Sequence, residues 1–225
     1  MRGSIQDDGF SIFTDVLGSS EVGSLLGGFP RDEKHRGRAG MRHALSDPNV
    51  LNLALDPRLL HITRQALGPE ARPFRATFFS KTPKANWLVV WHQDTALPIR
   101  EKRETPGWGP WSVKAGVFYA HAPTSALEGV LALRVHLDDS AATNGPLRVL
   151  PGTHQLGVLT DDAVHSLAQQ RLPVDCLVSS GGILAMRPLL VHSSSKSASE
   201  IPRRVLHIEY AASMFTHEGL ELAVV

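Results

Sequence analysis

The chain has 225 residues, enough to bury a large core within one sizeable domain. Its 23 basic and 22 acidic residues nearly cancel, which predicts neither a nucleic-acid-binding face nor a membrane-surface patch. No apolar run approaches the roughly 18 residues of a membrane span, and we expect no secretory signal at the amino terminus. The single cysteine, Cys176, excludes an internal disulfide, favours a reducing, cytoplasmic setting, and is interpreted as an inert strand residue rather than a nucleophile.

Helix signals are concentrated in the first third of the chain. A short helix is predicted from Ser19 to Leu26, because polar residues can cap its start and two glycines follow it. A second helical region opens at Ser46-Asp47-Pro48. The strongest signal runs from Asp56 to Gly68, with an Asp cap, Pro in the first turn, apolar residues at helical spacing and a terminating Gly. The charged run from Arg31 to Gly40 is interpreted as a solvated loop.

From Arg72 onward the pattern changes to short apolar stretches separated by Gly, Pro and Asn, which predicts about eight strands. One further helix is expected near Asp161 to Gln170. This order predicts an antiparallel sandwich or jelly roll with the amino-terminal helices packed on its outside. The predicted strands are Thr77–Lys81, Trp87–Trp91, Lys114–His121, Gly129–Leu137, Leu147–Leu150, Cys176–Val178, Gly182–Met186 and Arg204–Tyr210.

A His-x-Asp pair occurs twice, and in a strand its two side chains face the same way. At His136 and Asp138 a half-exposed strand becomes a turn, so Asp138 has a structural role in bonding turn amides. At His92 and Asp94 an apolar strand with two tryptophans leads into the pair and gives it a dry surround. We therefore favour His92 and Asp94 as the metal-binding pair.

A third ligand is offered by His192, which ends a predicted apolar strand that starts at Leu189. Two imidazoles and one carboxylate leave three positions of a metal ion open, which suits iron(II) handling oxygen. Eleven residues after His192, Arg203 opens the last strong strand. Arg204 would point to the opposite face of that strand, where a surface ion pair is expected.

These residues together resemble the phytanoyl-CoA dioxygenase family of iron(II)- and 2-oxoglutarate-dependent oxygenases. The spacing from His192 to Arg203 matches that family, and Asn144 to His154, Asn-Gly-Pro-Leu…Pro-Gly-Thr-His, is similar to its Asn-Gly-Pro-Leu…Pro-Gly-Ser-His stretch. Thr153 replaces the usual serine but keeps the hydroxyl. The likeness runs from about Gln6 to Tyr210. It implies one domain over 1–225 that is mainly β with flanking α: a helical part over about 1–70 and a double-stranded β-helix (jelly roll, cupin-like) core over about 72–215.

The resemblance also implies a chemistry. Iron(II) would be bound by His92, Asp94 and His192, with 2-oxoglutarate and O2 at the open positions. Decarboxylation of 2-oxoglutarate to succinate would drive hydroxylation of a small or medium organic substrate. Asp94 favours hydroxylation over halogenation, because related halogenases have a small residue there. A guanidinium can bind the far carboxylate of 2-oxoglutarate bidentately, and the residues expected to contact this co-substrate are Arg203, Gln93, Ser194 and Lys81.

The long segment Thr95 to Val113 is interpreted as a lid or substrate wall, since loops of that length near a site often have such roles. Its Trp108 and Trp111 either shape the substrate pocket or are structural. We expect a small-molecule substrate, with no nucleic-acid or membrane partner. Two alternatives stay open: a noncatalytic metal- or ligand-binding jelly roll, and a zinc hydrolase that uses the same three ligands but leaves Arg203 unexplained. The substrate's identity does not follow from the sequence.

Overall fold

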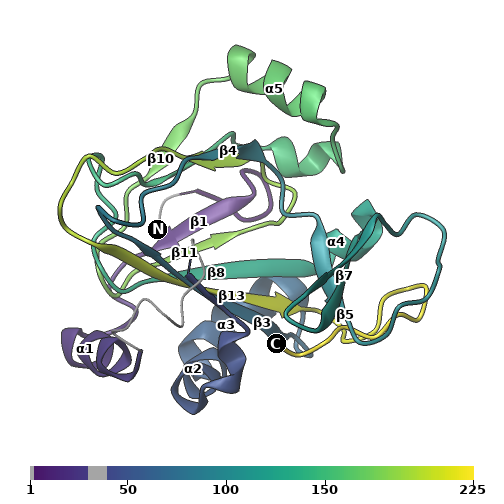
Figure 1. The fold of residues 1–225 in the computed structure, drawn as a ribbon, viewed down its shortest axis with the longest axis horizontal. Helices are drawn as coiled ribbons and strands as arrows, with labels where there is room; N and C mark the ends of the chain where they lie inside the picture. The colour runs from purple at the N-terminus through teal and green to yellow at the C-terminus, as the bar shows by residue number, and fades with distance from the viewer. Residues whose placement is uncertain (1–2, 30–39) are drawn as a thin grey trace.

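The computed structural model describes residues 3–29 and 40–225, so almost all of the charged run predicted as a solvated loop lies outside the described residues. Within these ranges the strands form three antiparallel sheets (Figure 1). The six-stranded sheet has the order β1-β11-β8-β13-β3-β2, formed by Phe10–Phe13, Ile183–Met186, Val130–His136, Arg203–Ala211, Arg72–Lys81 and Gly40–Arg42. The four-stranded sheet, β10-β9-β12-β4, contains Val174–Cys176, Leu147–Val149, His192–Ser194 and Val89–His92. The small sheet, β5-β7-β6, contains Ala96–Ile99, Val117–His121 and Trp111–Lys114.

Three amino-terminal helices cover one face of the six-stranded sheet (Figure 1). They are α1 (Ser19–Gly28), α2 (Pro48–Ala54) and α3 (Pro57–Leu67). The carboxylates of Asp47 and Asp56 each accept a 2.8 Å hydrogen bond from a first-turn amide of α2 and α3, which satisfies donors that a helix start leaves unpaired. The predicted helices are therefore present, as is α5 (Asp161–Gln170), although α1 continues through the two glycines that were expected to end it. A short helix, α4, spans Thr124–Glu128, and 3-10 turns occur at Ala44–Ser46 and Thr153–Leu156.

A second apolar cluster lies between the six-stranded and four-stranded sheets. Phe10 and Leu184 come from the larger sheet, and Val149 and Cys176 come from the smaller one. Cys176 is fully buried in this cluster, in agreement with its interpretation as a strand residue. The two sheets therefore pack face to face, with the helices on the outside of the larger one.

Three details differ from the sequence-based prediction. The strand predicted over 114–121 is a hairpin, in which Ala115 and Gly116 turn the chain at φ of 49° and 82° between β6 and β7. The segment predicted as a long loop contains β5 and the start of β6. Pro98 is tolerated there because β5 is an edge strand. Finally, β12 begins at His192, so the apolar residues before it form a buried connection.

The end of the chain packs against the six-stranded sheet. The backbone of Val225 donates to Phe74 at 2.8 Å and accepts from Ala76 at 2.9 Å, both in β3. The single-domain division, with its helical part over about 1–70, stays a prediction that this packing supports. Among residues 3–29 and 40–225, no helix combines the length and apolar character needed to cross a membrane.

Candidate metal centre and substrate cavity

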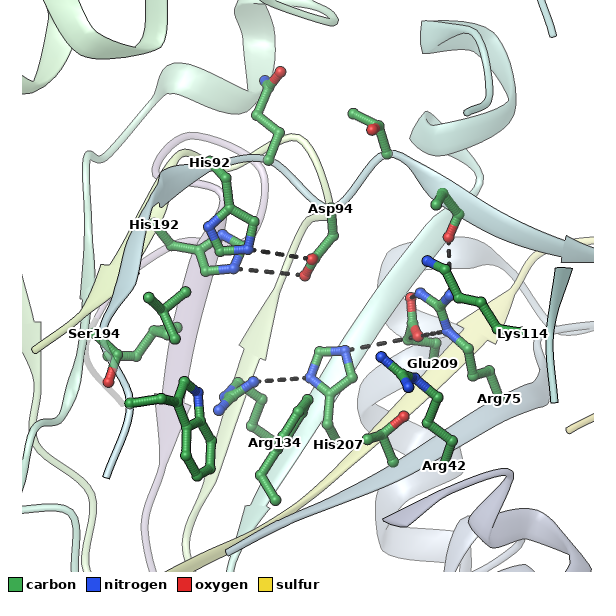
Figure 2. Close-up of a pocket in the computed structure, with 18 of the residues that line it drawn as sticks. Arg42, Arg75, His92, Asp94, Lys114, Arg134, His192, Ser194, His207 and Glu209 are labelled. Atoms are coloured by element: carbon green, nitrogen blue, oxygen red, sulfur yellow. Dashed lines mark hydrogen bonds and ion pairs between the residues drawn. The ribbon is translucent and has the colours of Figure 1, made fainter. Parts of the chain in front are cut away.

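Two histidines on neighbouring strands face one carboxylate. His92 ends β4, and its partner across the ladder is His192, the first residue of β12. Asp94 follows β4, with Oδ1 lying 3.6 Å from Nε2 of His92 and Oδ2 lying 3.5 Å from Nε2 of His192. Figure 2 shows the three side chains converging on one point. The pairing of β4 with β12 therefore brings together residues that are one hundred positions apart in the chain.

The backbone determines which nitrogen each ring presents to that point. Nδ1 of His92 lies 2.9 Å from the carbonyl oxygen of Val90, and Nδ1 of His192 lies 2.8 Å from that of Leu190. A carbonyl only accepts, so each ring holds its proton on Nδ1 when neutral. The lone pair of each Nε2 is then directed toward Asp94, which is the arrangement a metal ion requires.

The charges of the three groups are strongly coupled. Burial acts to raise the pKa of Asp94, but the facing rings of His192 and His92 outweigh it and hold this pKa well below its ordinary range. Burial lowers the pKa of His192 to about 4 despite the attraction of Asp94. At neutral pH the centre therefore offers a carboxylate and a neutral His192 imidazole, both competent to bind a cation.

The donor set fits one metal ion. In the part of the chain that the structure describes, His92, Asp94 and His192 form the one group of at least three His, Cys, Asp or Glu residues whose ligand atoms all lie within 4.8 Å of one another. Two imidazoles and one carboxylate on the same side of an ion suit iron(II) with open positions for further ligands. Their assignment as metal ligands stays a prediction, which this geometry supports.

The three residues line a cavity of about 400 Å³, near the lower end of the range for small-molecule sites. Its floor is the inner face of the six-stranded sheet. Alternate residues of a strand point to the same side, so every second residue of the central strands can face the cavity. Strand register places Lys81 opposite Arg203, Thr77 opposite His207, and Arg75 opposite Glu209. The floor residues that line the cavity are Arg75, Thr77 and Phe79 from β3, Arg134 from β8, and Arg203, His207 and Glu209 from β13.

Buried cations gather at one end of this cavity, where Arg134 and Arg203 line the wall and Lys81 lies opposite Arg203 in the strand register. Lys81, Arg134 and Arg203 are 1%, 8% and 5% exposed, and none has a carboxylate within 4.0 Å among the described residues. Burial, followed by repulsion from Arg134, lowers the pKa of Arg203 to about 10. Burial also lowers the pKa of Lys81 to about 8, with Arg203 and Arg134 adding to the shift. Because a buried unpaired cation is costly, this end is suited to bind an anion.

Ser194 and Gln93, both predicted to contact the co-substrate, lie in different surroundings. The Ser194 hydroxyl lies in the cationic end, 2.9 Å from Lys81 Nζ and 3.5 Å from Nη2 of Arg203. The Gln93 side-chain amide donates to the carbonyls of Gly157 and Leu189 at 2.9 and 2.7 Å, and its oxygen accepts from the amide of Leu159 at 2.8 Å. Gln93 thus binds a neighbouring loop, and its predicted contact with the co-substrate stays a prediction.

The second His-x-Asp pair is held in structural contacts. The Asp138 carboxylate accepts three hydrogen bonds of 2.7–2.8 Å from the backbone and guanidinium of Arg204. His136 is 1% exposed, and its Nδ1 lies 3.0 Å from the carbonyl oxygen of Arg134. Arg204 therefore pairs with Asp138 while Arg203 faces the cavity, as the alternation of strand side chains predicts.

The structure does not bring Trp108 and Trp111 to the cavity. Trp108 is buried in the core beneath the small sheet with its indole nitrogen 3.4 Å from Glu218, and Trp111 packs against the same core. Neither lines the cavity, so their structural interpretation is favoured. The tryptophan that does line it is Trp87. Sequence reasoning also missed the cavity residues Arg42, Arg75, Lys114, Arg134, His207 and Glu209.

A signal for some of these residues was present in the sequence. In β13, charged or polar residues at 203, 207 and 209 alternate with apolar residues at 206, 208 and 210. The same occurs at Arg75, Thr77 and Lys81 of β3. Charged residues are rarely buried unless they are paired or functional, so their recurrence at positions that share one face of a strand points to a polar internal face.

The Arg75–Glu209 ion pair crosses the cavity floor. Glu209 is 1% exposed, and Arg75 donates to both of its carboxylate oxygens and also, at 2.8 Å, to the carbonyl oxygen of Ala96. Burial raises the pKa of Glu209, although Arg75 partly opposes the shift. The pair links β13, β3 and the start of β5, so its loss should loosen the floor.

We expect Glu209→Ala to reduce the free energy of unfolding by about 3–5 kcal/mol, because it leaves the Arg75 charge largely buried and unpaired. Chemical denaturation followed by circular dichroism measures this change. Arg100→Ala is the matched control, since Arg100 pairs with Glu221 at 2.6 Å but its side chain is 70% exposed. That variant should lose less than about 1 kcal/mol. If the two variants lost the same free energy of unfolding, the conclusion that the buried pair stabilises the fold more than the exposed pair would be wrong.

Together the fold and the site define a class: a double-stranded β-helix that presents two imidazoles and one carboxylate to an internal cavity. Solved structures share this fold. EctD from S. alaskensis in its apoform aligns with a TM-score of 0.68 at 20% identity, covering 92% of this chain and 74% of that one. HygX from Streptomyces hygroscopicus, solved with nickel and 2-oxoglutarate bound, aligns with a TM-score of 0.65 at 20% identity, covering 94% and 86%.

Sequence comparison then gives the family. The phytanoyl-CoA dioxygenase (PhyH) family model matches residues 5–205, so the chain belongs to the phytanoyl-CoA dioxygenase family. Among curated proteins it is similar to an ectoine dioxygenase of Bordetella bronchiseptica, at 26% identity over 168 residues, which is 68% of this chain and 48% of the relative. The chain thus spans about half the length of the curated relatives that it matches.

Proposed function

We propose that this protein is an iron(II)- and 2-oxoglutarate-dependent dioxygenase that hydroxylates a small or medium organic substrate, with 2-oxoglutarate converted to succinate. The observation that carries the proposal is the presence, in one cavity, of the His92–Asp94–His192 centre and the buried Arg203, which has no carboxylate partner among residues 3–29 and 40–225. A metal site alone would suit several chemistries. The added buried cation suits a co-substrate that carries a carboxylate.

His92, Asp94 and His192 would hold the iron and leave three positions open. Bound together, iron(II), 2-oxoglutarate and O2 supply the oxidising power for C–H hydroxylation, and the protein supplies binding and orientation. Arg203 would bind the far carboxylate of 2-oxoglutarate, with Ser194 and Lys81 beside it. The hydrogen bonds from Nδ1 of His92 and His192 to backbone carbonyls fix both rings, and this would orient Nε2 of each ring toward the ion.

Three kinds of support accompany this proposal. The chain belongs to the phytanoyl-CoA dioxygenase family. A structural neighbour, HygX, was solved with 2-oxoglutarate and nickel, and another neighbour, EctD, with 2-oxoglutarate and 5-hydroxyectoine. The carboxylate of Asp94 occupies the position that halogenases of the broader group leave open, which favours hydroxylation. The single cysteine, buried between the sheets, supports the further proposal of a reducing, cytoplasmic setting.

Anaerobic titration with iron(II) and 2-oxoglutarate tests the proposal without knowledge of the substrate. We expect a weak visible charge-transfer band of the iron chelate in the wild-type protein, because the centre and Arg203 hold both components together. The band should be lost in His192→Ala and weakened in Arg203→Ala. No band in folded, iron-loaded wild-type protein would overturn the proposal and favour the noncatalytic or zinc-hydrolase alternatives.

A further inference from the structure

The end of the cavity opposite Arg203 also gathers positive charge. Figure 2 shows Arg42, Arg75 and Lys114 together on the side away from His192 and Ser194. Arg42 lies in β2 opposite Thr77, four residues along β3 from Lys81, which corresponds to roughly 13 Å of strand. The cavity thus has two cationic ends, with the metal centre between them on its roof.

The charges at this second end are not all compensated. Arg75 is paired with Glu209, as described above. Within the described ranges, Arg42 and Lys114 have no carboxylate within 4.0 Å. Lys114 Nζ lies 5.0 Å from the centre of the Tyr119 ring, and Arg75 Cζ lies 5.8 Å from the same centre. Two cations without counter-charges therefore stand beside a third at this end.

The electrostatics of Lys114 agree with this geometry. Burial lowers the pKa of its ammonium, and repulsion from Arg42 and Arg75 lowers it further. Like charges that face a common space destabilise the empty site by mutual repulsion. An anion bound between Arg42 and Lys114 would remove that repulsion, so the arrangement is more favourable with a ligand than without one.

The whole cavity shows the same excess. Its walls contain five Arg and Lys side chains, Arg42, Arg75, Lys114, Arg134 and Arg203, and two carboxylates, Asp94 and Glu209, which leaves three positive charges when histidines count as neutral. The two charges of iron(II) and the two opposite charges of 2-oxoglutarate cancel. Three positive charges of the cavity wall therefore remain, and a negatively charged substrate would compensate them.

We propose that Arg42 and Lys114 form the substrate-binding subsite of this enzyme and that its substrate is a small organic anion, a carboxylate or a phosphate ester. This inference rests on the proposed dioxygenase function. A volume of about 400 Å³, shared with the co-substrate, fits a small substrate. Arg42 is exposed to solvent, so the anionic group can bind there while the rest of the molecule extends toward the centre. The arginine fork and the ammonium together suit both carboxylate and phosphate oxygens.

Calorimetric binding of matched probes tests this subsite. Anaerobic protein loaded with iron(II) and saturating 2-oxoglutarate, so that the Arg203 end is filled, is titrated with benzoate, phenyl phosphate and the neutral benzamide. We expect wild-type protein to bind at least one of the two anions about tenfold or more tightly than benzamide, as charge-assisted hydrogen bonds predict. Arg42→Gln/Lys114→Gln should lose this preference, and Lys114→Arg should retain it.

The control variant Arg72→Gln/Lys102→Gln removes the same two charges from exposed ion pairs outside the cavity wall, and it should keep the preference. The substrate inference is overturned if neither anion binds wild-type protein more tightly than benzamide at millimolar concentrations, or if the preference survives in Arg42→Gln/Lys114→Gln. The charge-transfer band, recorded on the same samples, distinguishes the two proposals. A normal band without anion preference defeats only the substrate inference, whereas loss of the band in wild-type protein defeats the dioxygenase function.

Discussion

Replacing Asp94 or His192 by Ala should abolish the conversion of 2-oxoglutarate to succinate. Each change removes one of three ligands, and loss of groups that merely support a ligand already costs about 10–100-fold in metal affinity or activity. We therefore expect both variants to form less than about one per cent of the wild-type amount of succinate. Succinate is quantified by chromatography after incubation with iron(II), 2-oxoglutarate and oxygen, with a panel of small organic anions present.

The second His-x-Asp pair provides the matched control. Asp138→Ala removes a carboxylate at the equivalent place in the other pair, where it bonds Arg204 and lies outside the cavity wall. This variant should keep its succinate production, and thermal melting confirms that all three variants are folded. Full turnover in Asp94→Ala or His192→Ala would show that the metal centre has been assigned wrongly.

Arg203→Ala should raise the concentration of 2-oxoglutarate required for half-maximal turnover by about 10- to 100-fold, with a smaller effect on the maximal rate. The guanidinium remains charged at neutral pH, because its pKa stays near 10 despite burial. Hydrogen bonds to a charged partner contribute about 1.5–3 kcal/mol, and each 1.4 kcal/mol corresponds to about a factor of ten. Initial rates at varied 2-oxoglutarate concentration measure the shift.

The neighbouring arginine is the natural comparison. Arg204→Ala removes a guanidinium that pairs with Asp138 on the other face of β13, so the 2-oxoglutarate requirement should change little. Its melting temperature should fall only slightly, since this pair is partly exposed. If Arg204→Ala raised the requirement and Arg203→Ala did not, the co-substrate site would be displaced by one residue along the strand.

The helices could be predicted because their signals are local. Asp47 and Asp56 cap α2 and α3 through bonds to amides two residues away, so a short window of sequence contains the whole interaction. Strand β5 was missed for the opposite reason. Its formation depends on pairing with β7, which no local window shows, and Pro98 within it argues against a strand unless the edge position is known.

The residues of the candidate site also fall into a group that the sequence predicts and a group that it does not. Residues His92, Asp94 and His192 were found from their spacing and from a family resemblance, and the structure brings them together. Arg42 and Lys114 were missed, because their approach depends on the packing of β2 and the small sheet around β3. For Trp108 and Trp111 the sequence leaves open whether they shape the pocket or are structural, because the length of their segment does not determine which way a side chain packs.

Strand β13 contributes one face to the hydrophobic core and the other face to the cavity, so the same strand serves both folding and function. Its residues 206, 208 and 210 pack against the helices, and the hydroxyl of Tyr210 donates to Ala54 at 2.9 Å, while 203, 207 and 209 line the cavity. Deleting a single residue would exchange the two sets, placing charges in the apolar core and apolar groups in the cavity. We therefore expect related proteins to lack insertions and deletions within β13. The turn between β6 and β7 can vary in length, because it does not set the register of a buried strand.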